Sequence, residues 1–164
     1  MFQISSPTTN LPKRELYRNL AAQLEALFAG ENNAIANMAN TSAFLFQSLT
    51  ELNWAGFYVL RGGELVLGPF QGKPACVRIP VGRGVCGTVV AERRPIIVPD
   101  VHAFPGHIAC DSASRSELVV PLIRGEAISG VLDLDSPVPG RFDDEDRLGC
   151  EALAAILVRA SNPL

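Results

Sequence analysis

The sequence has no excess of basic residues: its 164 residues include 14 Lys and Arg against 17 Asp and Glu, a formal net charge of −3. Nucleic acids and anionic membranes bind mainly to clustered positive charge, so neither is expected as a partner. No stretch approaches the roughly 18 consecutive apolar residues of a membrane-spanning helix. Residues 1–18 contain no apolar run of signal-peptide length. We therefore expect a cytoplasmic protein.

Cysteine is also scarce, with four residues in the chain, and no CxxC motif is present. The two closest cysteines, Cys76 and Cys86, lie ten residues apart, which excludes a zinc ribbon and a thioredoxin-type motif. A metal site built from Cys76, Cys86, Cys110 and His107 would have irregular spacing and no close ligand pair, and we expect no metal. Because cytoplasmic thiols stay reduced, these cysteines are candidates for catalysis, metal binding or packing.

The length suits one domain that buries roughly 70% of its unfolded surface. Residues 1–13, rich in Ser, Thr, Pro and Asn, are expected to form a flexible lead-in, and residues 14–164 a single domain. Apolar residues spaced three and four apart predict helices, and alternating apolar residues between turn signals predict strands. The expected helices span about 15–30, 33–50, 84–93 and 144–156, and the expected strands span 54–61, 64–68, 76–80, 96–99, 116–124 and 127–136.

Helices at both ends of a run of mostly antiparallel strands predict an α+β fold. Its central antiparallel sheet has helices packed on one face and a ligand pocket on the other. Residues 101–115 are expected to form a long loop, and long ordered loops in compact domains are usually functional. Residues 82–87 match GxGxxG, but no βαβ unit surrounds them, so we expect no dinucleotide cofactor.

Two strands place acidic residues on one face of the expected sheet. Successive side chains of a strand point to opposite faces, so Asp133 and Asp135 share one face, opposite Leu132 and Leu134. If strand 116–124 pairs with this strand, Glu117 lies on the same side. Clustered acids repel one another, which raises the pKa of at least one and makes it a proton donor. The alternative is a polar, solvated sheet face.

An aromatic wall is expected beside these acids. Trp54 and Tyr58 are four residues apart in one strand and therefore share a face, with space left at Gly56. Acids on one side and aromatic rings on the other suit a small ligand with a cationic end and an apolar end. The loop that carries Cys110 would form the lid of this pocket.

Cys110 lies among Gly, His and small polar residues, which suit a loop or a helix start. Backbone N–H groups there could lower the pKa of the thiol below its usual value of about 8.5, or could bind a ligand carboxylate. The alternative is a small buried hydrophobe, the commonest environment of an intracellular cysteine. We interpret Cys86 as packing at a helix start and Cys150 as a core residue. Cys76 is expected to begin a strand directly after a loop and to be the more mobile thiol.

Six motifs stand out along the chain: Ile35–Asn40, Asn53–Tyr58, Leu67–Cys76, Gly82–Gly87, Asp100–Ser112 and Leu132–Pro137. Together they resemble the free methionine-(R)-sulfoxide reductases, a catalytic branch of the GAF-domain superfamily. The similarity extends from the first helix to the last, and the cysteine-bearing motifs are specific.

The resemblance implies a GAF fold, usually in a homodimer, and reduction of free, not protein-bound, L-methionine (R)-sulfoxide. It implies that Cys110 is the nucleophile, that Cys76 is the resolving cysteine, and that Cys86 can form an alternative disulfide. Thioredoxin is the implied reductant, and neither a metal nor an organic cofactor is required. The runner-up is a GAF module that senses a small molecule without turning it over.

The same resemblance assigns the substrate-binding residues. The acids would grip the ammonium group and polarise the sulfoxide, the aromatic pair would form the wall for the S-methyl end, and the loop next to Cys110 would face the carboxylate. The residues implied are Glu117, Asp133 and Asp135 for the acids, Trp54 and Tyr58 for the wall, and Ile108 and Ala109 for the loop.

Overall fold

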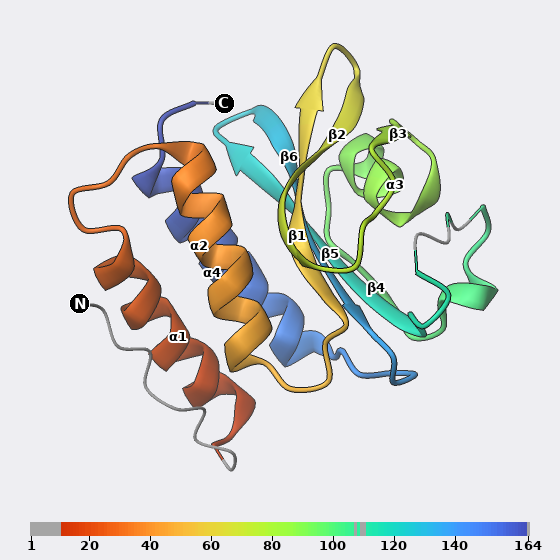
Figure 1. Cartoon of the computed structure of the whole chain (residues 1–164), viewed down its shortest axis with the longest axis horizontal. Coiled ribbons are helices and arrows are strands. Elements are labelled where there is room, and N and C mark those ends of the chain that lie inside the picture. Colours follow the sequence, from red (N-terminus) through yellow and green to blue (C-terminus); the bar gives the residue numbers. More distant parts are fainter. Residues whose placement is uncertain (1–10, 107, 109–110, 164) are drawn as a thin grey trace.

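The computed structural model describes residues 11–106, 108 and 111–163 (Figure 1). The chain forms α1 (Lys13–Leu27), α2 (Ala34–Ser48), β1 (Trp54–Arg61), β2 (Glu64–Gly72), β3 (Arg78–Pro80), α3 (Gly84–Glu92), β4 (Ile96–Val98), the short 3-10 helix η1 (Val101–Ala103), β5 (Ser116–Arg124), β6 (Ala127–Ser136) and α4 (Asp144–Ala160). None of the helices described in these ranges is long and apolar enough to cross a membrane.

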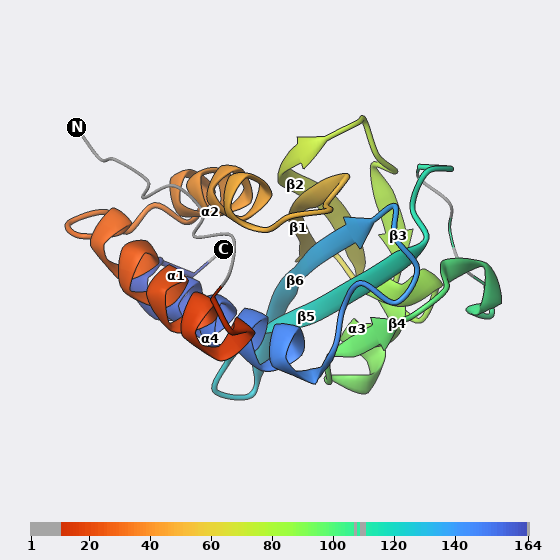
Figure 2. The same cartoon turned by 90° about the horizontal axis from the view of Figure 1, so that it is seen from below.

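The six strands form one antiparallel sheet in the order β3-β2-β1-β6-β5-β4. Helices α1, α2 and α4 cover one face, and α3 with the segment after β4 lies over the other (Figures 1 and 2). The expected α+β fold is therefore confirmed, with the addition that one helix belongs to the pocket side.

The sheet separates two apolar clusters because its strands alternate. Leu118, Leu132 and Leu134 point toward α1, α2 and α4 and are at most 1% exposed. Val119 and Val131, on the opposite face, pack with residues of α3. The three leucines therefore hold the sheet against the helices, whereas Val119 and Val131 face the pocket side.

The long C-terminal helix is fixed at its start by a charged network. The side chain of Asp143 accepts hydrogen bonds from the backbone N–H groups of Glu145 and Asp146, and the side chain of Asp146 accepts one from the backbone N–H of Asp143, forming a capping box. Asp146 is 1% exposed and also accepts hydrogen bonds from Lys13 and Tyr17 of α1. Helices α1 and α4, far apart in sequence, are thus joined side by side.

Two predicted strand bounds were wrong. Strand β2 continues to Gly72 instead of ending at residue 68, because the β1–β2 register shifts between Gly56 and Tyr58 and pairing resumes at Phe70. Strand β3 begins at Arg78, so Cys76 precedes it and lies in the connection from β2.

Candidate active site

The predicted acids meet on the pocket face of the sheet. Strands β5 and β6 pair so that Glu117 lies opposite Asp135, and Val119 lies opposite Asp133. Glu117 and Asp133 are each only 6% exposed, and Asp135 is half-buried. This burial excludes the solvated sheet face considered above.

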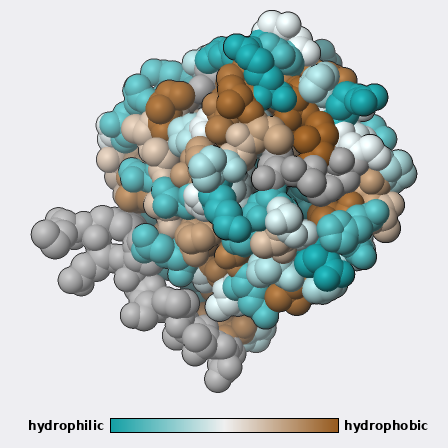
Figure 3. Space-filling model, turned by 45° about the vertical axis from the view of Figure 1, so that its right-hand side comes forward, coloured by the Kyte–Doolittle hydropathy of each residue, from teal (hydrophilic) through white to brown (hydrophobic). Residues whose placement is uncertain are grey.

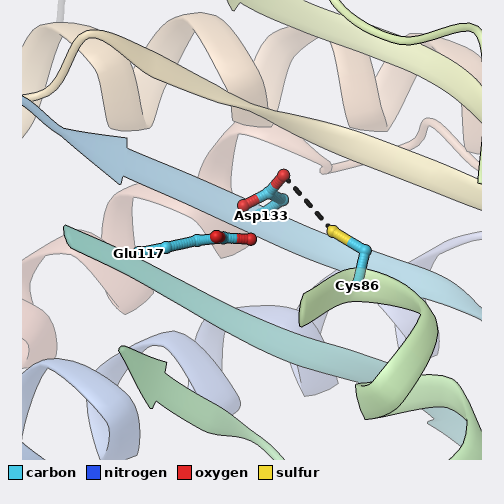
Figure 4. Close-up of side chains that lie close together, drawn as sticks. All are labelled: Cys86, Glu117 and Asp133. Carbon is cyan, nitrogen blue, oxygen red and sulfur yellow. Dashed lines mark hydrogen bonds between the residues drawn. The ribbon is translucent and has the colours of Figure 1, made fainter. Parts of the chain in front are cut away.

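Cys86 approaches this acid cluster from the first turn of α3 (Figure 4). Its thiol donates a hydrogen bond to Oδ2 of Asp133 at 3.4 Å. Oδ1 of Asp133 is buried and has no hydrogen-bond partner among the described residues. Interpreting Cys86 as simple packing at a helix start was incomplete, because its sulfur contacts the carboxylate at the centre of the site.

The electrostatics of this cluster favour bound protons. Burial raises the pKa of Glu117 well above its usual range, and the neighbouring Asp133 and Asp135 raise it further. Burial raises the pKa of Asp133 to about 7, against the opposing effect of the Cys86 hydrogen bond. The pKa of Asp135 and the pKa of the Cys86 thiol are also raised, mainly by burial and secondly by the charge of Asp133. The site therefore holds carboxylic acids that can donate a proton near neutral pH, or a negative charge that a cation can stabilise.

The aromatic wall contains three rings. Trp54 stacks on Tyr58 with ring centroids 5.9 Å apart, and on Phe70 at 5.3 Å. A Cβ at Gly56 would lie 2.3 Å from Cβ of Phe70 and 2.7 Å from the Trp54 ring, so glycine is required for this stack. Phe70 was not predicted from the sequence, because the register shift in β2 interrupts the alternation of side chains between the two faces of the sheet.

The same wall holds the β2–β3 connection over the pocket. The indole N–H of Trp54 donates to the carbonyl of Lys73 at 3.2 Å, and the hydroxyl of Tyr58 donates to the carbonyl of Cys76 at 3.0 Å. Both polar tips of the buried aromatics are thereby satisfied. The wall thus fixes the backbone at Cys76, the residue that the family resemblance implies to be the resolving cysteine.

A polar rim closes the other side of the pocket. Asp111 accepts hydrogen bonds from the backbone N–H of Ala113, the ammonium of Lys73 and the amide of Asn53. The hydrogen bond from the backbone N–H of Ala113 is the main cause that holds the pKa of Asp111 below its usual range, and the hydrogen bond from Lys73 adds to it. The Asn53 amide also donates to Ser114, 3.0 Å away. No short-range sequence signal identified this rim, whose members come together only when the segments around residues 73 and 111 meet.

Most of these groups line one pocket, whose lining residues include Trp54, Tyr58, Lys73, Ala75, Cys86, Ile108, Asp111, Ser114, Glu117, Asp133 and Asp135. On this side of the molecule, hydrophobic and hydrophilic side chains are interspersed (Figure 3). Three ligand atoms in this pocket, one each from Cys86, Glu117 and Asp133, lie within 4.8 Å of one another. Among the described residues, these three side chains could therefore hold a metal ion.

Known proteins identify this architecture. A GAF-domain family model matches residues 36–160. Free methionine-R-sulfoxide reductase of Escherichia coli is 59% identical over 145 residues, 88% of each chain. The chain belongs to the free methionine-R-sulfoxide reductases of the GAF-domain family.

Solved structures of related proteins have the same fold. A structure of free methionine-R-sulfoxide reductase from Neisseria meningitidis in complex with its substrate superimposes with a TM-score of 0.92 at 44% identity, covering 98% of this chain and 95% of that one. A putative GAF sensor protein from Burkholderia vietnamiensis superimposes with a TM-score of 0.89 at 58% identity, covering 92% and 96%. The resemblance predicted from the motifs is thus confirmed, and the chain is an oxidoreductase of this reductase family.

The cysteines of this reductase-family chain lie in different environments. Cys76 is disulfide-bonded in the connection between β2 and β3, whereas Cys86 and Cys150 are free. Cys150 is 0% exposed beside Tyr17, so its assignment to the core is confirmed. Cys110 lies outside the described residues.

The two other residues predicted in the loop have different outcomes. Ile108 lines the pocket and packs over Gly84 at the start of α3. Ala109 lies outside the described residues, as does His107, the histidine of the rejected metal site. Of these two residues, Ile108 is the one that the structure places at the pocket, and its role in substrate binding stays a prediction.

Proposed function

We propose that this protein reduces free L-methionine (R)-sulfoxide to L-methionine. The observation that carries the proposal is the buried acid cluster facing the wall of Trp54 and Tyr58, in which Oδ1 of Asp133 has no hydrogen-bond partner among the described residues. A free methionine sulfoxide has an ammonium at one end and an S-methyl group at the other, matching these two surfaces. The substrate named for the related Escherichia coli and Neisseria meningitidis proteins supports the same assignment.

Recognition of the ammonium explains why a free amino acid would be required. Inserting a cation between Glu117, Asp133 and Asp135 relieves their repulsion and replaces the water lost on burial. A methionine sulfoxide inside a peptide has a neutral amide at this position. That amide would leave the buried charges without compensation, and such uncompensated charges cost several kcal/mol.

The proposed reaction transfers oxygen from the substrate to Cys110. The thiol sulfur attacks the sulfoxide sulfur while a protonated acid of the cluster donates to the sulfoxide oxygen, which weakens the S–O bond. The oxygen passes to Cys110, giving a sulfenic acid and methionine. The substrate sulfur gains the two electrons that the cysteine sulfur loses, so no metal or organic cofactor is needed.

A second thiol then completes the cycle. We propose that Cys76 attacks the sulfenic acid, forming a disulfide and releasing the oxygen as water. Disulfide bonding of Cys76 in the structure, with Cys86 free, supports this choice of resolving residue. Thioredoxin would reduce the disulfide by exchange. By family resemblance, we also propose a cytoplasmic homodimer.

The test is an assay that compares free R, free S and peptide-bound methionine sulfoxide with thioredoxin as reductant. We expect turnover of the free R form, with rates for the other two lower by at least about 100-fold, because binding geometry and the buried charges select one ligand. Equal turnover of the peptide-bound form would contradict the proposal. Binding of a small molecule without any turnover would favour a sensory GAF module.

A further inference from the structure

Cys86, Glu117 and Asp133 together form a set of metal-ligand atoms, and metal binding is a role that the proposed reduction does not use. Cys86 comes from α3, Glu117 from β5 and Asp133 from β6 (Figure 4). All three residues are at least nine-tenths buried, with exposures of 4%, 6% and 6%. Three rigid elements thus hold a sulfur and two carboxylates within 4.8 Å of one another.

Their spacing suits a tetrahedral cation. Ligands on Zn²⁺ at about 2.3 Å for sulfur and about 2.1 Å for oxygen lie about 3.6 Å apart when the angle between them is tetrahedral. The sulfur of Cys86 lies 3.4 Å from Oδ2 of Asp133. These two ligands are therefore already near the required separation, and the Glu117 oxygen, within 4.8 Å of both, needs to approach by at most about 1 Å.

A second observation points to a ligand at the same place. Oδ1 of Asp133 is buried without a hydrogen-bond partner among the described residues, an arrangement that costs free energy unless something occupies the pocket. One thiolate with two carboxylates favours a borderline or soft dication such as Zn²⁺ or Cd²⁺ over Mg²⁺ or Ca²⁺, which prefer oxygen alone.

We propose that Cys86, Glu117 and Asp133 bind a thiophilic divalent cation, with Zn²⁺ as the physiological candidate, and that the bound cation closes the pocket to ligands. The pocket gives the ion a path to all three residues. Three protein ligands leave a fourth position for water, as in open zinc sites. Competition with methionine sulfoxide rests on the proposed function, because both ligands would neutralise the same carboxylates.

The binding test uses the oxidised chain, in which Cys76 is disulfide-bonded and Cys86 and Cys150 are free thiols. Titration with Cd²⁺ is expected to give one cadmium per chain with cadmium–thiolate charge-transfer absorption, and Zn²⁺ is expected to abolish that absorption. Cys86→Ser should remove the absorption, while Cys150→Ser should retain it. Absorption that is absent from the native chain, or that survives Cys86→Ser, would overturn the metal site.

Carboxylate variants test the other ligands without reference to activity. Asp133→Asn is expected to weaken cadmium binding by at least about 100-fold, since even groups that only support a ligand change affinity 10- to 100-fold. Asp144→Asn is the matched control, because the side chain of Asp144 is 82% exposed on α4. Equal affinity in Asp133→Asn and the native chain would overturn the site, and near-ultraviolet circular dichroism checks that each variant is folded.

Competition separates this inference from the proposed function. Free L-methionine (R)-sulfoxide is expected to raise the apparent Kd for Cd²⁺ linearly with its own concentration, as a competing ligand does. If cadmium binds through Cys86 but the sulfoxide does not displace it, the metal site stands and its overlap with the substrate is overturned. If the reductase assay fails while cadmium still binds, only the proposed function falls.

Discussion

Replacing Glu117 by glutamine is expected to lower kcat/KM for free methionine sulfoxide by about 100- to 1000-fold while making the protein more resistant to heat. Activity falls because the amide neither offers a negative charge to the ammonium nor donates a carboxylic proton. Stability rises because Glu117 is buried beside Asp133 and Asp135, and the glutamine amide can donate a hydrogen bond to either carboxylate. Steady-state kinetics and the thermal midpoint measure the two effects.

The gain in stability should depend on pH. Burial and the neighbouring acids raise the pKa of Glu117 in the folded chain above its unfolded value of about 4.3. The folded state therefore binds more protons than the unfolded state, and stability falls as the pH rises above about 4 toward the raised value. Glu117→Gln removes this loss, so its advantage in thermal midpoint should be small at pH 4 and reach a few degrees at pH 8.

A matched variant controls for loss of any glutamate charge. Glu126 lies exposed in the turn between β5 and β6, the same two strands that carry the acid cluster. Glu126→Gln should leave both kcat/KM and the pH dependence of the midpoint unchanged. A Glu117→Gln variant that is fully active, or that is less stable than the native chain at pH 8, would contradict the electrostatic description of the site.

Cys76→Ser is expected to convert a recycling enzyme into one that acts once. Mixing the reduced variant with excess methionine (R)-sulfoxide should release about one methionine per chain, and thioredoxin should then support little further turnover, because the sulfenic acid at Cys110 lacks its resolving thiol. Rapid-quench measurement of methionine, with a chemical probe for sulfenic acid, checks both parts. Cys110→Ser should release no methionine.

The remaining thiol near the site is a poor substitute. Burial, followed by the charges of Asp133 and Glu117, raises the pKa of the Cys86 thiol, so its thiolate is rare at neutral pH. Cys150→Ser is the control and should recycle normally, because Cys150 is buried between α1 and α4. Full recycling in Cys76→Ser would move the resolving role to Cys86.

Local patterns predicted most of the fold and the acid cluster. The strands Ser116–Arg124 and Ala127–Ser136 have the predicted bounds, since a short turn at Gly125 and Glu126 separates two alternating runs. Once these strands pair, the period of two places Glu117 with Asp133 and Asp135. The acids could therefore be located from the strand pattern and the assumed pairing of two neighbouring strands.

The contacts that complete the pocket depend on packing between distant segments. The hydrogen bond from Cys86 to Asp133 spans 47 residues and exists because α3 lies on the sheet. The ion pair of Lys73 with Asp111 spans 38 residues and joins two loops. Neither loop has a periodic pattern, so the sequence alone contained no signal for these pairs.

Calorimetry on Cys110→Ser tests most directly whether the buried acids recognise the ammonium of a free amino acid. Because we propose Cys110 as the nucleophile, this variant should not turn over the ligand, and binding can then be measured at equilibrium. Free L-methionine (R)-sulfoxide should bind, and its N-acetyl derivative, which lacks the positive charge, should bind at least about 100-fold more weakly. Equal affinities for the two compounds would contradict recognition of the ammonium by Glu117, Asp133 and Asp135.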